Sequence, residues 1–107
     1  MSWVSGALKV DSVQVSSKFR RATDAYMHWC PACQEMHRLP DTWTFNGDLE
    51  SPTFSPSFKH SGWIGEERES VCHYVLTKGV LAYCDDCTHS MKGMSVPIPD
   101  LPPEMCD

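Results

Sequence analysis

Hydrophobic and polar residues alternate with a period of two along most of this chain, which is the pattern of half-buried β-strands. Residues 8–15 predict a first strand or pair of strands, and residues 25–29 predict another. The helical period is rare, and the only helical candidate is a turn or two near residues 88–92. We therefore expect a mainly β fold, built as a small antiparallel single domain.

The clearest hairpin is predicted over residues 71–83, with Lys78-Gly79 as its turn. Counting outward from a two-residue turn at this point places His73 opposite Cys84. Their Cβ atoms would then lie about 5 Å apart on one face of the sheet.

A second hairpin is predicted where Phe45 runs into Asn46-Gly47, a pair typical of tight β-turns. The returning segment contains Pro52 and Pro56. Because proline lacks the N–H that a strand ladder needs, this segment should be an edge strand or a loop.

Four of the eight prolines fall within residues 97–107, which predicts an extended, polyproline-like tail. We therefore divide the chain into one β domain, residues 1–96, and a C-terminal tail, residues 97–107. A chain of 107 residues buries only about 60 to 65% of its unfolded surface. The core of so small a domain needs the support of a metal or of disulfides.

The net charge is −5 and is unevenly distributed, because residues 41–107 carry most of the acidic side chains. Such a chain lacks the basic surface that binds phosphates, which argues against a nucleic-acid partner. No apolar run approaches the ~20 residues that span a bilayer, and the first residues do not resemble a signal peptide. We expect a cytoplasmic protein with no membrane association.

Two cysteine pairs indicate a metal site, Cys30-Pro-Ala-Cys33 and Cys84-Asp-Asp-Cys87. Two thiolates three residues apart in a tight turn can both point inward, and two such turns provide the four ligands of a tetrahedral zinc site. Cysteines of a cytoplasmic protein are also kept reduced. We therefore predict a structural Zn²⁺ held by these four cysteines.

More donors are available than one site requires, and the reserve ligands are Cys72, His73, His89 and His37. One alternative uses Cys72 or His73 in place of Cys84. Another is a second metal held by the three histidines of this reserve set. His28 and His60 are expected to be ordinary surface or edge residues.

The segment Trp29-Cys-Pro-Ala-Cys33 also resembles the active-site motif of thioredoxin-like oxidoreductases. That motif must open an amphipathic helix, and Pro40 leaves too little chain for one. The chain also lacks Gly-x-Ser-x-Gly, His-Glu-x-x-His and phosphate-binding glycine motifs. No catalytic residue is assigned from the sequence.

Five motifs together resemble an uncharacterised family of small phage and prophage proteins, some of which carry the label ammonia monooxygenase. In order they are residues 29–33 with His37, residues 43–48, residues 51–57, Cys72-His73 and residues 86–89. The resemblance implies a phage or mobile-element origin and zinc binding, but no established activity. Cys84 usually has no cysteine counterpart in that family, which favours Cys72 or His73 as a ligand. Some members lie beside genes for ubiquitin-like conjugation.

Asp48 and the hydroxyl-rich residues 51–57 are candidates for contacting a partner, because such loops expose backbone and hydrogen-bond donors. The partner-contact candidates are Asp48, Thr53 and Ser55. The alternative is that Asp48 only shapes the hairpin loop and that the prolines protect a sheet edge.

These observations favour a phage-encoded, zinc-stabilised binding module that acts on a protein, such as a host defence factor, and is not an enzyme. The alternative is a small zinc-dependent hydrolase or ligand-sequestering protein that uses the histidines. The number of coordinating protein ligands distinguishes the two, since a hydrolytic zinc keeps one position for water. The sequence leaves the oligomeric state open.

Overall fold

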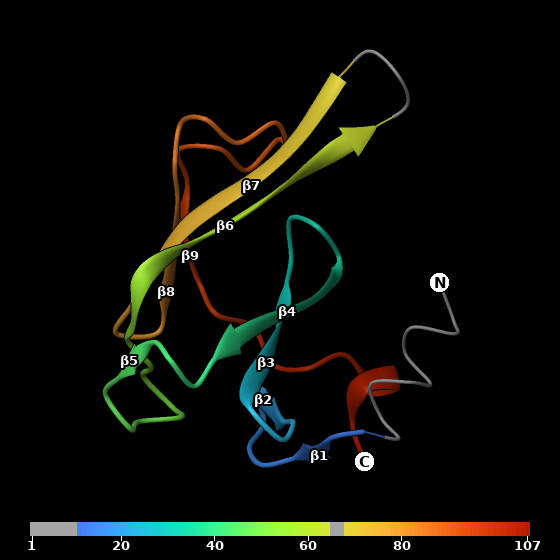
Figure 1. Cartoon of the computed structure of the whole chain (residues 1–107), viewed down its shortest axis with the longest axis vertical. Coiled ribbons are helices and arrows are strands. Elements are labelled where there is room, and N and C mark those ends of the chain that lie inside the picture. The colour runs from blue at the N-terminus through green and yellow to red at the C-terminus, as the bar shows by residue number, and fades with distance from the viewer. Residues whose placement is uncertain (1–10, 65–67) are drawn as a thin grey trace.

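The computed structural model describes residues 11–64 and 68–107, which form two antiparallel sheets (Figure 1). The first sheet has the order β1-β2-β3-β4 and the second the order β5-β6-β7-β8-β9. The predicted mainly β class is therefore confirmed. The elements of the described residues are β1 Val13–Gln14, β2 Phe19–Arg21, β3 Ala25–Cys30, β4 Glu35–Pro40, β5 Thr44–Phe45, β6 Phe54–Ile64, β7 Arg68–Thr77, β8 Val80–Tyr83, β9 Ser95–Pro97 and the 3₁₀ turn η1 Pro103–Met105.

The β7–β8 hairpin has the predicted turn and register. Lys78 and Gly79 have φ angles of 49° and 77°, and two positive φ angles are the requirement of the tight turn that matches strand twist. Beyond the last ladder pair, the backbone N–H of Cys84 donates to the carbonyl of His73 at 2.8 Å. His73 and Cys84 are therefore cross-strand neighbours, as the sequence predicted.

The second predicted hairpin also forms, but its loop is longer than a tight turn. Phe45 pairs with Phe54, so the connection spans residues 46–53. The side-chain Oδ1 of Asn46 accepts hydrogen bonds from the backbone N–H groups of Asp48 and Thr53, each at 3.1 Å. Asn46 therefore organises a wide loop in place of a two-residue turn.

The returning strand, β6, is an edge strand for most of its length, as its prolines predicted. β7 pairs with it from Phe54 to Ile64, whereas β5 pairs only with Phe54 and Ser55. The ladder with β7 is also irregular between Phe54 and Phe58, where β6 bulges. This bulge determines where Ser57 lies on the sheet.

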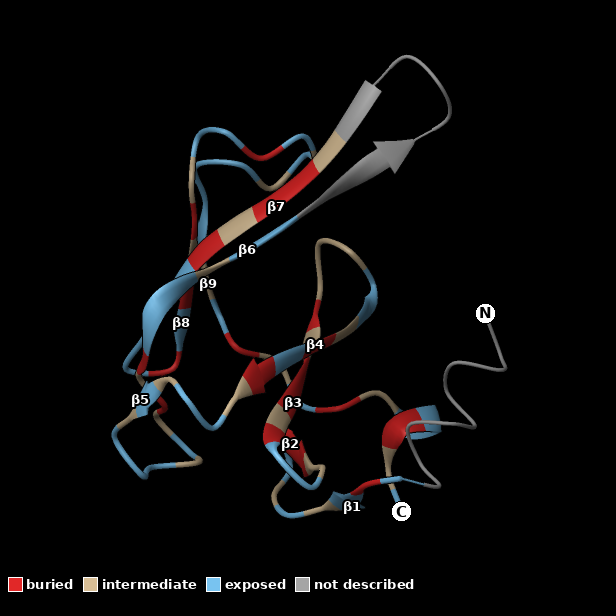
Figure 2. Ribbon diagram, viewed as in Figure 1, coloured by how far each residue is buried: buried red, intermediate tan, exposed pale blue. Residues whose placement is uncertain are grey.

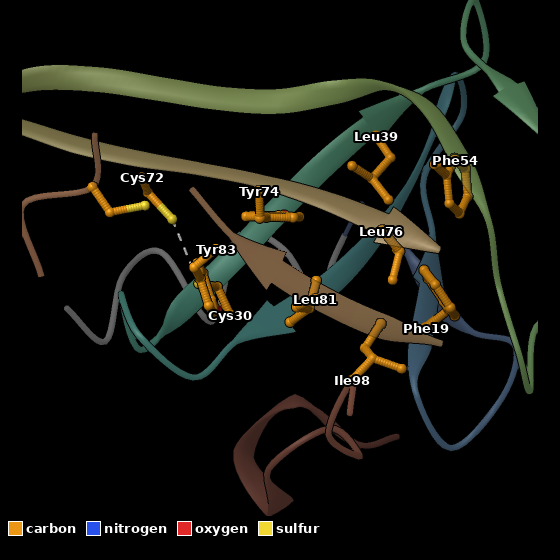
Figure 3. Close-up of a cluster of buried hydrophobic side chains, with 11 residues drawn as sticks. Phe19, Cys30, Leu39, Phe54, Cys72, Tyr74, Leu76, Leu81, Tyr83 and Ile98 are labelled. Atoms are coloured by element: carbon orange, nitrogen blue, oxygen red, sulfur yellow. Dashed lines mark hydrogen bonds between the residues drawn. The ribbon is translucent and has the colours of Figure 1, made fainter. Parts of the chain in front are cut away.

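The core lies between the two sheets. From Cys72 to Thr77 of β7, buried residues alternate with exposed or half-buried ones (Figure 2), and Cys72, Tyr74 and Leu76 form the buried face. Figure 3 shows Leu76 beside Phe19 of the first sheet and Cys72 beside Cys30 and Tyr83, with Leu81 of β8 between them. The alternation of hydrophobic and polar residues in this part of the sequence therefore arises because one face of the second sheet packs against the core and the other faces outward.

The C-terminal residues lie against the first sheet. Leu101 and Met105 are buried, and the carbonyl of Met105 accepts a hydrogen bond from the guanidinium of Arg20 at 2.8 Å. Arg20 has no exposed surface and also donates to the hydroxyl and carbonyl of Ser12. This hydrogen-bonded arginine joins the two ends of the described chain, and the domain boundary at residue 96 stays a prediction.

Two local expectations are wrong. His28 is fully buried and not at the surface, because it faces Tyr74 across the core. Residues 88–92 form turns and no helix, since their hydrogen bonds close single turns only. His60 is exposed as expected, and residues 8–10 of the first predicted strand lie outside the described residues. No helix in the described part of the chain is long and apolar enough to cross a membrane.

Candidate functional site

Ser57 lies on the outer face of the second sheet because of the bulge in β6. Phe54 pairs with Leu76 and Phe58 with Tyr74, so residues 55–57 face a single residue of β7. Extra residues of this kind re-aim side chains and are common beside active sites. The hydroxyl of Ser57 lies 3.1 Å from Nε2 of His73.

The second ring nitrogen of His73 meets a carboxylate. Its Nδ1 lies 3.0 Å and 3.1 Å from the two carboxylate oxygens of Asp86. Asp86 lies in the turn after β8, and the pairing of Cys84 with His73 sets where this turn begins. The imidazole of His73 therefore bridges a hydroxyl and a carboxylate.

The backbone of His73 is held by Cys87. The N–H of His73 donates to Sγ of Cys87 at 3.2 Å, and this thiol donates to the carbonyl of His73 at 3.1 Å. Cys87 is buried, whereas the side chain of His73 keeps 24% of its surface exposed. The imidazole is thus accessible from the outside while its backbone is fixed from within.

Lys59 supports the carboxylate. It is the cross-strand partner of His73, and its Nζ lies 3.5 Å from Oδ2 of Asp86. Partial loss of water alone would raise the pKa of Asp86, but the hydrogen bond with His73 and the charge of Lys59 shift this pKa below its usual value. Asp86 is therefore ionised at neutral pH and can hold a protonated His73.

Hydroxyl, imidazole and carboxylate in this order are the parts of an activated nucleophile. The hydroxyl attacks a carbonyl, the imidazole takes its proton, and the carboxylate orients the imidazole and stabilises its charged form. Such triads are recognised by geometry and not by chain order. Ser57, His73 and Asp86 have this geometry, and we call them the triad.

A second cluster of reactive side chains lies on the inner face. Donor atoms of Cys30, Cys33, His37 and Cys72 all lie within 4.8 Å of one another. Sγ of Cys30 is 3.9 Å from that of Cys72 (Figure 3), close to the ~3.8 Å between sulfurs of a tetrahedral zinc site. We call these four residues the thiol-histidine cluster.

A chain of hydrogen bonds decides which nitrogen His37 offers. Burial is the main cause that lowers the pKa of His28 to about 4, so His28 is neutral at pH 7. Its Nδ1–H donates to the carbonyl of Trp29, and its bare Nε2 accepts from the hydroxyl of Tyr74 at 2.5 Å. The oxygen of Tyr74 then accepts from Nδ1–H of His37 at 3.0 Å. Nε2 of His37 keeps a lone pair.

This nitrogen and the three thiols fit a metal ion. Nε2 of His37 is buried and has no hydrogen-bond partner in the described residues. Hydrogen bonds from Cys33 and Cys72 lower the pKa of Cys30, whereas their bonds to Cys30 raise the pKa of Cys33 to about 12 and that of Cys72 further. A bound metal would ionise all three and use the free lone pair.

The cysteines predicted as a single four-cysteine set are divided between two places. Cys30 and Cys33 belong to the thiol-histidine cluster, and the reserve ligands His37 and Cys72 join them. Cys84 groups instead with His73 and Asp86, and the buried thiol of Cys87, outside the four-donor group, bonds to the backbone of His73. Cys84 lies apart from the thiol-histidine cluster because Cys72 and His73 are neighbours on one strand and point to opposite faces.

Cys84 forms another group of possible metal donors with His73 and Asp86, also within 4.8 Å. Both ring nitrogens of His73 already have hydrogen-bond partners there. Burial and the charge of Asp86 raise the pKa of Cys84, which keeps its thiol protonated. These three side chains therefore suit the triad better than a metal.

The other predicted contact and ligand residues have local roles. Nδ1 of His89 accepts a hydrogen bond from the backbone N–H of Met91, and its ring packs on Tyr83 at 4.8 Å. Oδ1 of Asp48 accepts from two backbone N–H groups of its own loop. The hydroxyl of Thr53 accepts from the backbone N–H of Lys78, and Ser55 is exposed.

Sequence reasoning did not find Ser57 as a nucleophile, because no motif surrounds it. The signal was present in two parts: Ser57 lies within the hydroxyl-rich segment, and His73 follows Cys72. What was missing was the pairing of β6 with β7 and the bulge that it contains.

Comparison with protein families agrees with this geometry. Residues 3–84 match the family model of BubE, a bacterial ubiquitination-like system serine protease. The chain belongs to the BubE family. No curated protein and no solved structure matches it.

The BubE match covers Ser57, His73 and the whole thiol-histidine cluster, and it ends two residues before Asp86. The family thus belongs to bacterial ubiquitination-like systems, and its description as a serine protease agrees with a serine as the hydroxyl member of the triad. The phage origin implied by the sequence stays a prediction.

Proposed function

We propose that this protein is a serine protease that cleaves ubiquitin-like proteins, or their conjugates, in a bacterial ubiquitination-like system. The observation that carries the proposal is the 3.1 Å approach of the Ser57 hydroxyl to Nε2 of His73, with Asp86 on the opposite nitrogen. The family description names the reaction and the kind of system, and from the system we infer the class of substrate. The partner is accordingly a protein.

The chemistry proceeds through an acyl-enzyme. Oγ of Ser57 attacks the carbonyl of the scissile bond while Nε2 of His73 takes the hydroxyl proton. The charged imidazole is stabilised by Asp86 and returns the proton to the leaving amine as the bond breaks. Water then attacks the acyl-enzyme with His73 again as base, which releases the carboxylic acid and restores Ser57.

The test is covalent labelling combined with cleavage. A fluorophosphonate should label Ser57, and Ser57→Ala should abolish labelling and lower the cleavage rate of the system's ubiquitin-like protein, fused at its C-terminus to a reporter, by at least about 1,000-fold. Ser90→Ala, an exposed serine in a turn, is the matched control and should cleave normally. Full cleavage by Ser57→Ala would refute the proposal.

We further propose that the thiol-histidine cluster binds one structural Zn²⁺ through Cys30, Cys33, His37 and Cys72. Four protein ligands close a tetrahedral site and leave no position for a reactive water. The orphaned, buried Nε2 of His37 supports this assignment. The metal would supply folding free energy, and the peptide chemistry would belong to the triad.

Metal analysis of ligand variants tests this assignment. Native protein purified without added metal should contain one zinc per chain, and Cys72→Ser should lose it. Cys84→Ser changes a thiol outside the cluster and should keep its zinc. Loss of zinc in Cys84→Ser with retention in Cys72→Ser would return the site to the four-cysteine set predicted from the sequence.

A further inference from the structure

One edge of β6 is open beside the triad. After Ser55, β6 has β7 along one side, and no strand of the described residues pairs with the other (Figure 1). Ser57 stands at the start of this open edge. A row of backbone groups next to a nucleophile is a template for binding an extended chain.

The hydrogen bonds of β7 show which groups of β6 face outward. The carbonyls of His73 and Val71 accept from the N–H groups of Cys84 and Thr88, so their backbone groups point away from β6. Backbone groups alternate in direction along an antiparallel strand, so Tyr74 and Cys72 are the residues that bond to β6.

The partners of these residues in β6 bond inward. Tyr74 pairs with Phe58 and Cys72 with His60, so the N–H and C=O groups of Phe58 and His60 point to β7. By the same alternation, the backbone groups of Lys59 and Ser61 point to the open edge. Among the backbone groups that the structure describes, none forms a hydrogen bond with the outward N–H or C=O of Lys59.

We propose that the part of the substrate preceding the scissile bond binds as an added antiparallel strand along β6, hydrogen-bonded to the backbone of Lys59 and Ser61. This inference rests on the proposed protease function. A strand antiparallel to β6 runs from the Ile64 end toward Ser57. Its carboxyl end, where the scissile carbonyl lies, therefore arrives at the nucleophile.

β5 blocks the path of the substrate residues that follow the scissile bond. Thr44 and Phe45 occupy the edge of β6 at Ser55 and Phe54, so an added strand cannot continue past Ser57. The residues after the scissile bond must turn away from the sheet. The site therefore requires an extended conformation of the substrate residues before the scissile bond. It does not require one of the residues after it.

A proline at the open edge tests the inference. Ser61→Pro removes one outward N–H without removing a bond to β7, and proline is tolerated at such positions. We expect cleavage of the reporter fusion to fall at least 100-fold in kcat/KM while the fluorophosphonate still labels Ser57. The matched control is Ser95→Pro.

Ser95 lies on the opposite edge strand of the same sheet, and its N–H also faces outward, because the carbonyl of the preceding Met94 bonds to β8. Ser95→Pro should cleave like the native chain. Equal cleavage by Ser61→Pro and the native chain would overturn the inference and leave the protease proposal intact. Absence of labelling and cleavage in the native chain would instead refute the protease proposal.

If the Ser61→Pro variant does not fold, a second measurement on the native enzyme tests the same inference. Octapeptides ending at the cleavage site, identified by mass spectrometry of the reporter cleavage, compete for the native enzyme. N-methylation at alternate amides removes either the set of N–H groups that faces β6 or the set that faces solvent. The peptides methylated at the amides that face β6 should inhibit at least 10-fold less, and those methylated at the amides that face solvent should inhibit normally. Equal inhibition by both sets would overturn the proposed strand.

Discussion

Cys72 and His73 are adjacent in the chain and belong to two different sites. Side chains of neighbouring residues leave a strand on opposite faces, so the Cys72 thiol enters the thiol-histidine cluster while the His73 imidazole enters the triad. Any metal that holds Cys72 therefore fixes the strand that carries His73. One pair of residues therefore couples the stability of the core to the position of the proposed catalytic base.

Cys87 acts on the same histidine from another direction. Cys87→Ala removes both sulfur hydrogen bonds to the His73 backbone. We expect the free energy of unfolding to fall by about 1–2 kcal/mol and the cleavage rate to fall as well, because the base loses its support. Chemical denaturation and cleavage of the reporter fusion measure these effects.

The zinc content separates this role from that of a ligand. Cys87→Ala should keep one zinc per chain, because its thiol lies with the His73 backbone and outside the thiol-histidine cluster. Loss of the metal in this variant would show that Cys87 is a ligand, as the sequence alone first predicted.

At the level of elements, the β7–β8 hairpin determines where His73 and Asp86 meet. Its register depends on two residues with positive φ, Lys78 and Gly79. A shift of one residue would turn His73 inward and Cys72 outward, which would dismantle both sites at once. The turn is thus a small element with a large effect on function.

Two substitutions in this turn should change stability in opposite directions. Gly79→Ala places a Cβ 3.4 Å from the Cα of Ser51 in a strained conformation and should cost about 1 kcal/mol or more. Lys78→Asn supplies a residue that tolerates positive φ and should gain about 0.5 kcal/mol. Urea unfolding measures both, and a destabilised Lys78→Asn would indicate that the turn type is misassigned.

At the level of the whole molecule, the thiol-histidine cluster joins the two sheets. Cys30 and His37 come from β3 and β4 of the first sheet, and Cys72 comes from β7 of the second. Cys33 lies in the turn between β3 and β4. A metal bound there cross-links the halves of a chain whose core is small for its surface.

Metal removal should therefore affect folding and cleavage together. A strong chelator should lower the thermal unfolding temperature markedly and abolish cleavage, since binding free energy at a structural zinc is folding free energy. Adding zinc back should restore both. An apo-protein with native thermal stability that is nevertheless inactive would instead indicate a metal in the chemistry, as in the zinc-hydrolase alternative.

Much of the fold was readable from local patterns. Period-two alternation predicted the β class, and Lys78-Gly79 predicted the hairpin register to the residue. The expectation for His28 was wrong because its burial depends on Tyr74 from the other sheet, which no local pattern reports. The sequence favoured a binding module over an enzyme because no local motif marks Ser57 as a nucleophile.

The sequence by itself determined the β class, the strands near residues 25–29 and 71–83, the main turn and the presence of thiols suited to zinc, because these follow from residue types and from spacings of a few positions. Only the tertiary structure decided which donors meet. Cys30 reaches Cys72, and Ser57 reaches His73, through sheet packing and a bulge between strands distant in the chain. Such contacts depend on register and on face, and a single sequence does not encode either one locally.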